Sequence, residues 1–411
     1  MVLKILKLPE ITKSFPAEVK TLFQVFNSEI RLVGGCVRDL LLKKKIADFD
    51  FATKLLPDQI IKILEKNHLK AIPTGIKFGT ITAVVNHKNF EITTLRKDNE
   101  TDGRHCEPEF IDDYELDATR RDFTMNALYL DEAGNIYDYF DGISDLNNQE
   151  IKFIDDANKR IKEDYLRILR FFRFSCKYAK KLDREGLAAC VLQKENLKKL
   201  SRERIRSEFL KIVGNENKEN LLKILQVLKD QKISAEIFSA RLEIEALARL
   251  FEIEKKLEFS TNLKLKLAVL FLNENFDLKV FAREICATNL EKKYLQLVNF
   301  YSASSLNELK TLLAFEEKNL VLDLYLFALA RNNQSLKTDE AKKNIEFFQN
   351  FSLPNFPLNG DDLMQLGFKG SAVGDAMKKA KVFWAQNGFL LKKEDLIKFV
   401  LGSITNLNFS F

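Results

Sequence analysis

Two neighbouring aspartates near the start of the chain are the residues best suited to chemistry. Asp48 and Asp50 stand in the segment IADFDFAT, whose apolar residues predict a β-strand. Side chains two positions apart on a strand point to the same face, so both carboxylates could hold two Mg²⁺ ions about 4 Å apart. Glu91, in the later predicted strand NFEITTLR, is a candidate third metal ligand. An isolated Asp-x-Asp is more often a solvated turn or strand end.

A pair of glycines precedes these aspartates. Gly34 and Gly35 follow the apolar run IRLV and come just before a predicted helix. Free backbone N–H groups and the positive end of the helix dipole then face whatever lies beyond the strand, which suits a triphosphate. Arg38, one turn into the helix, can add a charge-assisted contact to the same group. A Gly-Gly pair alone usually marks only a turn, but a glycine turn, an arginine and paired aspartates in this order form a much more specific pattern.

This order resembles the class II CCA-adding enzymes and bacterial poly(A) polymerases, which belong to the polymerase β-like nucleotidyltransferase superfamily. The resemblance implies that Gly35 and Arg38 bind the incoming nucleotide and that the two aspartates bind catalytic metals. The later segment ATRRDFTMNALYLD matches the family motif Arg-Arg-Asp-Phe-Thr-x-Asn-Ala. That match implies that Arg121 contacts the nucleotide.

The segment EDYLRILRFFRF resembles the family's Glu-Asp-x-x-Arg motif, which implies a role in choosing the base. Asp164 and Arg167 are spaced i and i+3, so on a predicted helix they project from one face. Cytosine and adenine each offer an amino donor beside a ring-nitrogen acceptor, and a carboxylate beside a guanidinium matches that edge. A site that hydrogen-bonds its substrate rejects mismatched bases, because its own polar groups would stay unpaired. The alternative is a surface helix on which the two side chains simply pair with each other.

Two further groups of residues follow the base-choosing motif. Arg170 and Arg173 resemble family positions that contact the nucleotide phosphates, although they could instead serve only to dock the helical segment onto the domain before it. The segment LSRERIRSEF resembles another family motif. There Ser201 is expected to cap a helix, and Arg204 with Glu208 to form an i,i+4 pair, a structural role without catalysis.

Within the family, the chain looks like the CCA-adding branch. The arginine-rich segment typical of poly(A) polymerases is absent, and the polar, acidic segment 97–118 corresponds to the loop that CCA-adding enzymes need for the final A. Cys106, Tyr139 and Tyr165 stand where the family often has proline. The resemblance therefore implies addition of CCA to the 3′ end of tRNA from CTP and ATP, with release of pyrophosphate. A poly(A) polymerase, an enzyme adding only A, and a non-catalytic RNA-binding protein remain the alternatives.

Glycine and proline divide the chain into a mixed part and a helical part. Short β-rich runs alternate with helical stretches before about residue 155, whereas neither glycine nor proline occurs between Asn215 and Leu353. We therefore expect an α+β fold. Its polymerase-β-like nucleotidyltransferase head, residues 1–154, has a small mixed sheet, and an elongated helical neck (155–213), body (214–353) and tail (354–411) follow. Tail lysines on a predicted helix are candidates for contacting tRNA phosphates: Lys369, Lys378, Lys379 and Lys381.

Composition sets the cellular context. The net charge of +6 is compatible with RNA but does not argue for it. The five cysteines lack paired spacing, which favours a reduced chain without disulfides or zinc. No stretch approaches the roughly 20 apolar residues that span a bilayer, and the first residues do not resemble a signal peptide. We expect a soluble, cytoplasmic protein with no membrane partner.

Overall fold

The computed structural model describes residues 3–98, 108–273, 276–302, 304–332 and 338–405. It divides the chain into two compact units, Met1–Ile237 and Phe238–Phe411. The first unit contains both the predicted head and the predicted neck. The four-part division of the chain stays a prediction.

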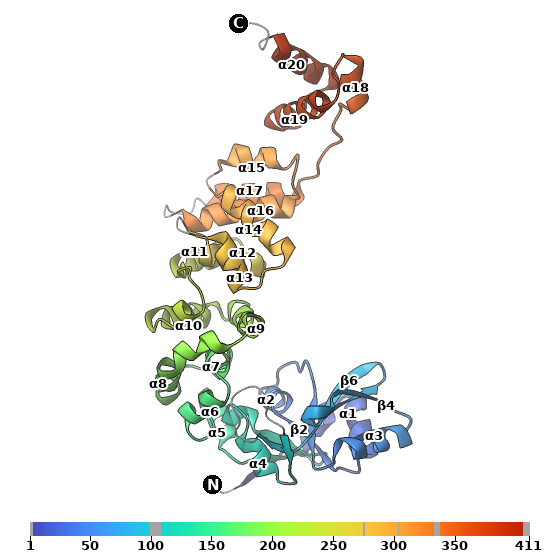
Figure 1. Cartoon of the computed structure of the whole chain (residues 1–411), viewed down its shortest axis with the longest axis vertical. Coiled ribbons are helices and arrows are strands. Elements are labelled where there is room, and N and C mark those ends of the chain that lie inside the picture. The colour runs from blue at the N-terminus through green and yellow to red at the C-terminus, as the bar shows by residue number, and fades with distance from the viewer. Residues whose placement is uncertain (1–2, 99–107, 274–275, 303, 333–337, 406–411) are drawn as a thin grey trace. The chain divides into compact units, whose positions relative to one another are not determined.

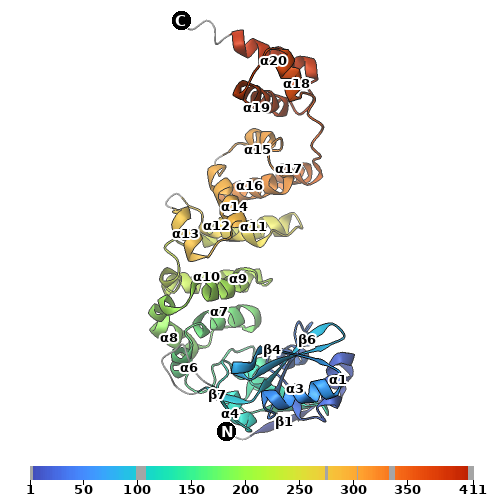
Figure 2. The same cartoon turned by 45° about the vertical axis from the view of Figure 1, so that its right-hand side comes forward.

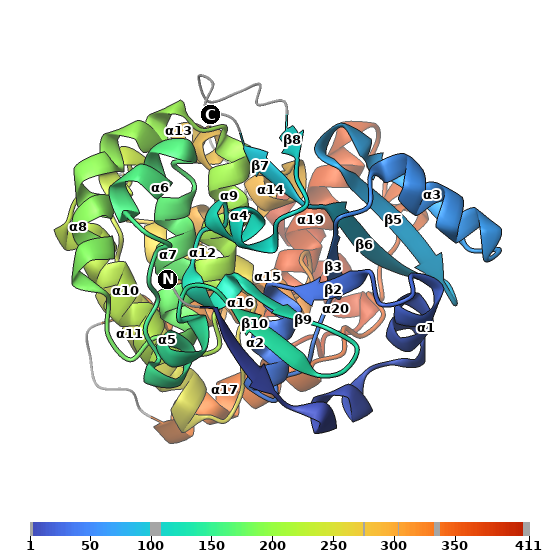
Figure 3. The same ribbon diagram turned by 90° about the horizontal axis from the view of Figure 1, so that it is seen from below.

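The first unit is built on an eight-stranded sheet with the order β1-β10-β9-β2-β3-β6-β5-β4 (Figure 3). All neighbouring strands are antiparallel except β3 and β6, so the sheet is mixed, as predicted. The strands are β1 Lys4–Lys7, β2 Ile30–Val33, β3 Asp50–Thr53, β4 Lys70–Gly75, β5 Thr80–Val85, β6 Lys88–Thr94, β9 Leu128–Leu130 and β10 Asn135–Asp138. A separate two-stranded ribbon pairs β7 Arg96–Asp98 with β8 Pro108–Phe110.

The segments FGTITAVV and NFEITTLR form a β-hairpin. Strands β5 and β6 pair in register from Thr80 opposite Thr93 to Val85 opposite Lys88. The two connecting residues, Asn86 and His87, have φ values of 48° and 63°. Positive φ at both central positions is what a two-residue turn needs to match the twist of its strands.

Three helices cover one face of this sheet: α1 Ala17–Val25, α2 Gly35–Leu41 and α3 Pro57–Lys66. Their apolar side chains pack with Phe51 and Ile92, which point to the same side from β3 and β6. Since strand side chains alternate between faces, Asp50 and Glu91 belong to the opposite face. On that side Ala52 packs with Tyr114 of α4 Tyr114–Thr119 and with buried Tyr129.

Helices follow the sheet within the same unit (Figure 1). They are α5 Gly142–Asn148, α6 Ala157–Glu163, α7 Arg167–Tyr178, α8 Arg184–Gln193, α9 Arg202–Val213 and α10 Lys218–Asp230. Phe123 of the head packs against Phe153 and against Phe171 and Phe174 of α7. Large buried aromatic rings therefore fasten the first of the long neck helices to the head.

Over the described residues of the second unit the regular elements are all helices (Figure 2). The absence of glycine and proline predicted this as far as Leu353. Its helices are α11 Ile244–Lys256, α12 Leu263–Phe271, α13 Leu278–Glu284, α14 Asn289–Phe300, α15 Leu306–Leu312, α16 Lys318–Arg331, α17 Thr338–Asn350, α18 Gly360–Gln365, α19 Ser371–Gln386 and α20 Lys393–Thr405. The last three surround a separate apolar cluster that contains Trp384. The first unit also contains short 3₁₀ helices at Pro9–Ser14, Ile76–Phe78, Thr124–Asn126, Lys194–Lys199 and Ser234–Glu236.

Candidate active site

The glycine turn forms as predicted. Strand β2 ends at Val33, Gly34 adopts a φ of +75°, and α2 begins at Gly35. A β-carbon at Gly34 would lie 3.4 Å from Nη1 of Arg121 and 3.5 Å from the carbonyl oxygen of Asn126. Only glycine adopts this backbone without strain. The arginine of the second motif therefore lies directly over the glycine turn.

Arg121 is held in place by a buried carboxylate. Its Nη2 donates to Oδ2 of Asp117 at 3.1 Å, and its Nε donates to the Tyr129 hydroxyl at 3.2 Å. That hydroxyl in turn donates to Asp117 at 2.7 Å. Burial alone would raise the pKa of Asp117, but Arg121 and Arg120 lower it to about 2. Two of the guanidinium nitrogens are thus fixed, and Nη1 is the one that lies at Gly34.

The predicted carboxylates converge near this arginine. Asp50 is the first residue of β3 and is paired in register with Glu91 of β6. Asp48 lies just before the strand, so the prediction that it belongs to the strand is wrong. The pKa of Asp50 is raised to about 6, first by desolvation and then by the nearby charges of Glu91 and Asp48, while Arg121 acts in the opposite direction. These mutual effects place all four groups in one electrostatic site.

Whether these three carboxylates suit a metal ion depends on which other groups of the protein already bind them. No hydrogen bond or ion pair with another described residue satisfies the side chains of Asp48, Asp50 or Glu91. Repelling, unsatisfied carboxylates suit a divalent cation, and Mg²⁺ commonly takes only one or two protein carboxylates beside substrate phosphates. Over the described part of the chain, however, no three His, Cys, Asp or Glu side chains gather closely enough to form a metal site. The donor chemistry of the two aspartates suits a divalent metal and Mg²⁺ itself stays a prediction, whereas Glu91 as a third ligand is not assembled among the described residues.

Arg38 lies beside the turn but is already engaged. A β-carbon at Gly35 would lie 3.5 Å from its Nη2. Its Nη1 donates to Oδ1 of Asn126 at 2.6 Å, its Nε donates to Asp39 at 2.9 Å, and its guanidinium lies 4.6 Å from the ring centroid of Tyr178. The side chain is buried. Nucleotide contact by Arg38 stays a prediction, and the structure adds a role in joining α2 to α7.

Asp164 and Arg167 do not lie on one helical face, which corrects the prediction. Helix α6 ends at Glu163, Asp164 is extended with φ −152° and ψ 105°, and α7 begins at Arg167. The alternative of a direct pair between them fails too, because Asp164 accepts from Nη2 of Arg204 at 2.8 Å. Arg167 instead donates to Glu163 at 2.8 Å. The two residues are three positions apart, as a shared helical face requires, but α6 has ended before Asp164 and α7 begins only at Arg167.

The two following arginines pair with carboxylates of different parts of the first unit. Arg170 donates to Oδ2 of Asp122 at 2.6 Å and so ties α7 to the head. Arg173 forms a 2.6 Å ion pair with Glu208 of α9, which keeps it inside the neck. The predicted pairing of Arg204 with Glu208 is therefore wrong, since each takes a partner from α6–α7. The structure supports the docking alternative for Arg170 but not for Arg173, and phosphate contact by either arginine stays a prediction.

Comparisons with known proteins show to which family the chain belongs. Residues 30–152 match the family model of the poly A polymerase head domain. The chain is 33% identical over 413 residues to the mouse CCA tRNA nucleotidyltransferase 1, mitochondrial, which covers 96% of this chain and 92% of the relative. It belongs to the CCA tRNA nucleotidyltransferase family. The CCA-adding enzyme of Listeria innocua is 32% identical and covers 82% of this chain and 84% of its own length.

Solved structures in this family share the fold. The Bacillus stearothermophilus CCA-adding enzyme, solved in complex with CTP, superposes with a TM-score of 0.74 at 24% identity and covers 95% of this chain and 98% of its own. The Thermotoga maritima enzyme, solved with a tRNA, gives a TM-score of 0.73 at 19% identity and covers 97% and 99%. At these identities the match establishes the fold of the whole chain: a nucleotidyltransferase head followed by helices.

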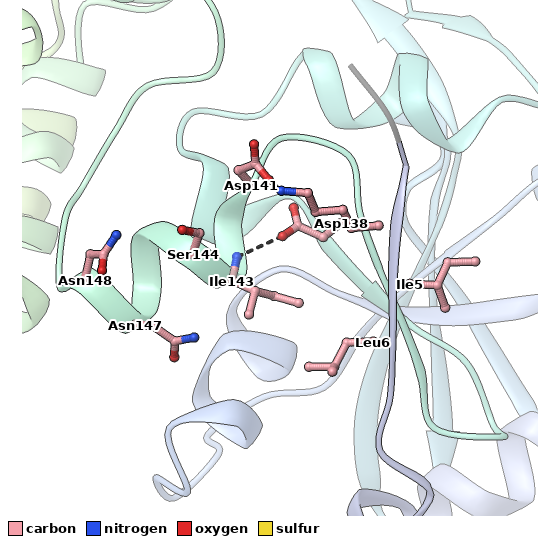
Figure 4. A pocket seen from close by; sticks show the side chains of 9 residues that line it. Ile5, Leu6, Asp138, Asp141, Ile143, Ser144, Asn147 and Asn148 are labelled. Atoms are coloured by element: carbon pink, nitrogen blue, oxygen red, sulfur yellow. Dashed lines mark hydrogen bonds and ion pairs between the residues drawn. The ribbon is translucent and has the colours of Figure 1, made fainter.

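A pocket elsewhere in the head contains none of the predicted site residues (Figure 4). It has a volume of about 510 Å³ and lies between β1 and α5. Asp138, which lines it, accepts from the backbone N–H groups of Phe140, Gly142 and Ile143. This carboxylate therefore satisfies backbone N–H groups at the start of α5.

Three site residues were missed from the sequence: Asp117, Tyr129 and Arg204. Asp117 precedes Arg121 by four residues at the end of α4, so helical i,i+4 spacing could have revealed it. Tyr129 and Arg204 stand in the quoted family motifs, but their contacts with Arg121 and Asp164 were not predicted, because these contacts depend on strand pairing and helix packing. In this CCA tRNA nucleotidyltransferase family member, the described cysteines Cys36, Cys176, Cys190 and Cys286 are free. Within the described residues, no helix is long and apolar enough to cross a membrane.

Proposed function

We propose that this protein adds CCA to the 3′ end of tRNA, from CTP and ATP, with release of pyrophosphate. The observation that carries the proposal is 33% identity to a CCA tRNA nucleotidyltransferase over 96% of the chain. The geometry supports it, since Arg121 lies at the glycine turn. The charges of Arg121, Asp48 and Glu91 all act on the carboxylate of Asp50. The relatives named as CCA-adding enzymes favour this product over a poly(A) tail or a single A.

The residues divide the task as follows. The backbone at Gly34 and Gly35 and the free Nη1 edge of Arg121 bind the triphosphate, and Asp117 with Tyr129 keeps that arginine oriented. Asp48 and Asp50 hold Mg²⁺. When bound, the metal supplies the Lewis acidity that activates the attacking hydroxyl and stabilises the leaving pyrophosphate.

Base choice is assigned to Asp164 and Arg167, which lie at the junction of α6 and α7. A carboxylate acceptor and a guanidinium donor suit the amino bases, so cytosine and adenine are accepted and uracil and guanine rejected. Arg167 also donates through Nη2 to the carbonyl oxygen of Arg120, at 2.7 Å, in the segment that carries Arg121. The base-choosing arginine is thus bonded to the residue next to the triphosphate-binding one.

The test uses the full chain with a tRNA transcript lacking its terminal CCA, together with Mg²⁺, CTP and ATP. We expect sequenced product ends to gain CCA. Asp48→Asn and Asp50→Asn should each reduce incorporation more than about 100-fold, because even outer-shell metal partners are worth 10- to 100-fold. The matched control is Asp58→Asn, an exposed aspartate in the first turn of α3. It should retain wild-type incorporation.

Other outcomes identify the alternatives. Extension of a generic RNA with ATP alone would identify a poly(A) polymerase, and a single A on a tRNA ending in CC, with no use of CTP, would identify an A-adding enzyme. Equal tRNA binding by wild type and Asp48→Asn, without incorporation by either, would favour a non-catalytic RNA-binding protein. Contacts of the tail lysines with tRNA stay predictions, both for Lys369 and for Lys378, Lys379 and Lys381 on α19. A cytoplasmic location also stays a prediction, and the vertebrate relatives carry mitochondrial names.

A further inference from the structure

The carboxylate assigned to base choice has a defined orientation in this structure. Asp164 lies in the break between α6 and α7, where its Oδ1 accepts from the backbone N–H of Leu166 at 3.1 Å. Its Oδ2 accepts from Nη2 of Arg204 at 2.8 Å. One bond comes from its own segment and the other from α9. The side chain of Asp164 remains 32% exposed, so a ligand can still reach it.

The donor of the base-choosing pair is held by different groups. Nη1 of Arg167 donates to Oε2 of Glu163 at 2.8 Å and to the carbonyl oxygen of Arg160 at 2.9 Å. Its Nη2 donates to the carbonyl oxygen of Arg120 at 2.7 Å. These three bonds hold Arg167 without Asp164 and leave two of the five guanidinium N–H donors for a base. Acceptor and donor are therefore kept apart by separate sets of contacts.

We propose that Arg204 is a positioning residue for base selection, which acts by fixing the Asp164 carboxylate as an acceptor; this inference rests on the proposed function. A carboxylate has about four lone-pair sites, so two bonds leave capacity for the amino group of cytosine or adenine. Without Arg204 only the Leu166 bond restrains the group. The carboxylate would then be free to turn toward the guanidinium of Arg167 and occupy the space that a base needs.

The expected effect is moderate and specific. An exposed ion pair is worth little in stability, and the same order of energy corresponds to about a two- to fivefold change in an equilibrium. We expect Arg204→Gln to lower the preference for CTP over UTP, and for ATP over GTP, by about that factor. The change should appear in the KM of the nucleotide rather than in that of the tRNA. Arg204→Lys keeps the charge but not the guanidinium geometry, so its nucleotide preference should lie between those of wild type and Arg204→Gln.

The control variant is Arg202→Gln in the same helix. Arg202 donates to the carbonyl oxygen of Ile237 at 2.6 Å, so its loss perturbs the anchoring of α9 without removing the bond to Asp164. We expect its nucleotide preference to match wild type. All variants are compared by single-turnover addition to the same tRNA, with folding checked by thermal melting.

A double-mutant cycle with Asp164→Ala separates the interpretations. If Arg204 acts through Asp164, Arg204→Gln should change the nucleotide preference in the wild-type background and leave it unchanged in Asp164→Ala. An equal effect in both backgrounds, or a change confined to the KM for tRNA, would overturn the inference. Wild type that adds no nucleotide would refute the proposed function instead, so the two failures are distinguishable.

Discussion

Replacing Asp117 with asparagine should weaken the head by an amount that depends on pH. Asp117 is 1% exposed and carries the charge that orients Arg121. Its pKa is lowered from 3.8 to about 2. With roughly 1.4 kcal/mol for each pKa unit, the ionised carboxylate contributes about 2.5 kcal/mol to the stability of the folded head. Asn keeps the size of the side chain but removes that charge.

The lowered pKa of Asp117 determines how its contribution to stability changes with pH. Because the pKa in the folded protein lies below the ordinary value, the contribution is present above about pH 3.8 and is lost as the pH falls toward 2. We therefore expect wild type to exceed Asp117→Asn by about 2.5 kcal/mol in free energy of unfolding at pH 7. The difference should largely vanish near pH 2.

The chain offers an internal control for this measurement. Its single tryptophan, Trp384, is buried in the second unit, so its fluorescence reports unfolding there. Hydrogen exchange of peptides from 114–130, followed against urea, reports on the head. The variant should shift exchange in the head and leave the Trp384 transition unchanged. A difference of equal size at pH 7 and pH 2 would refute the reasoning, since it would show lost packing rather than lost charge.

Two other substitutions test the framework around the site. Gly142→Ala should destabilise the head by about 1 to 3 kcal/mol, because a β-carbon would lie 2.3 Å from the carbonyl oxygen of Thr124. The control, Gly374→Ala in α19, has open space around it and should be neutral or stabilising. Thermal melting of both variants measures the difference. Arg170→Ala should cost about 2 kcal/mol by leaving buried Asp122 without its cation and should speed hydrogen exchange in α7, and unchanged exchange would contradict a docking role.

Local patterns in the sequence predicted the parts of the site that lie within one or two elements. The apolar residues of NFEITTLR predicted strand β6, and the run from strand to paired glycines predicted the turn at Gly34. Helical texture without glycine or proline predicted the helices between Asn215 and Leu353. In each case the residues that determine the structure are close neighbours in the chain, so their types and spacing carry the information.

The break between α6 and α7 shows where such reasoning stops. The helical spacing of Asp164 and Arg167 was read across a helix end, although an aspartate that bonds the backbone N–H two residues later is a known competitor of helix formation. Asp164 makes that bond to Leu166. Its second partner, Arg204, comes from α9 and depends on helix packing. Periodicity could indicate the residues but not their partners.

One consequence concerns how variants of the nucleotide site are interpreted. Arg38 donates to Asn126, and Asn126 donates to Asp122, which also accepts from Arg170. A continuous set of hydrogen bonds therefore joins α2, the helix after the glycine turn, to the neck. Replacing Arg38 or Arg170 therefore disturbs head–neck docking together with any nucleotide contact. Arg121 differs, because its side-chain bonds stay within the head. Loss of nucleotide affinity in an Arg121 variant that keeps wild-type exchange in α7 would isolate binding from docking.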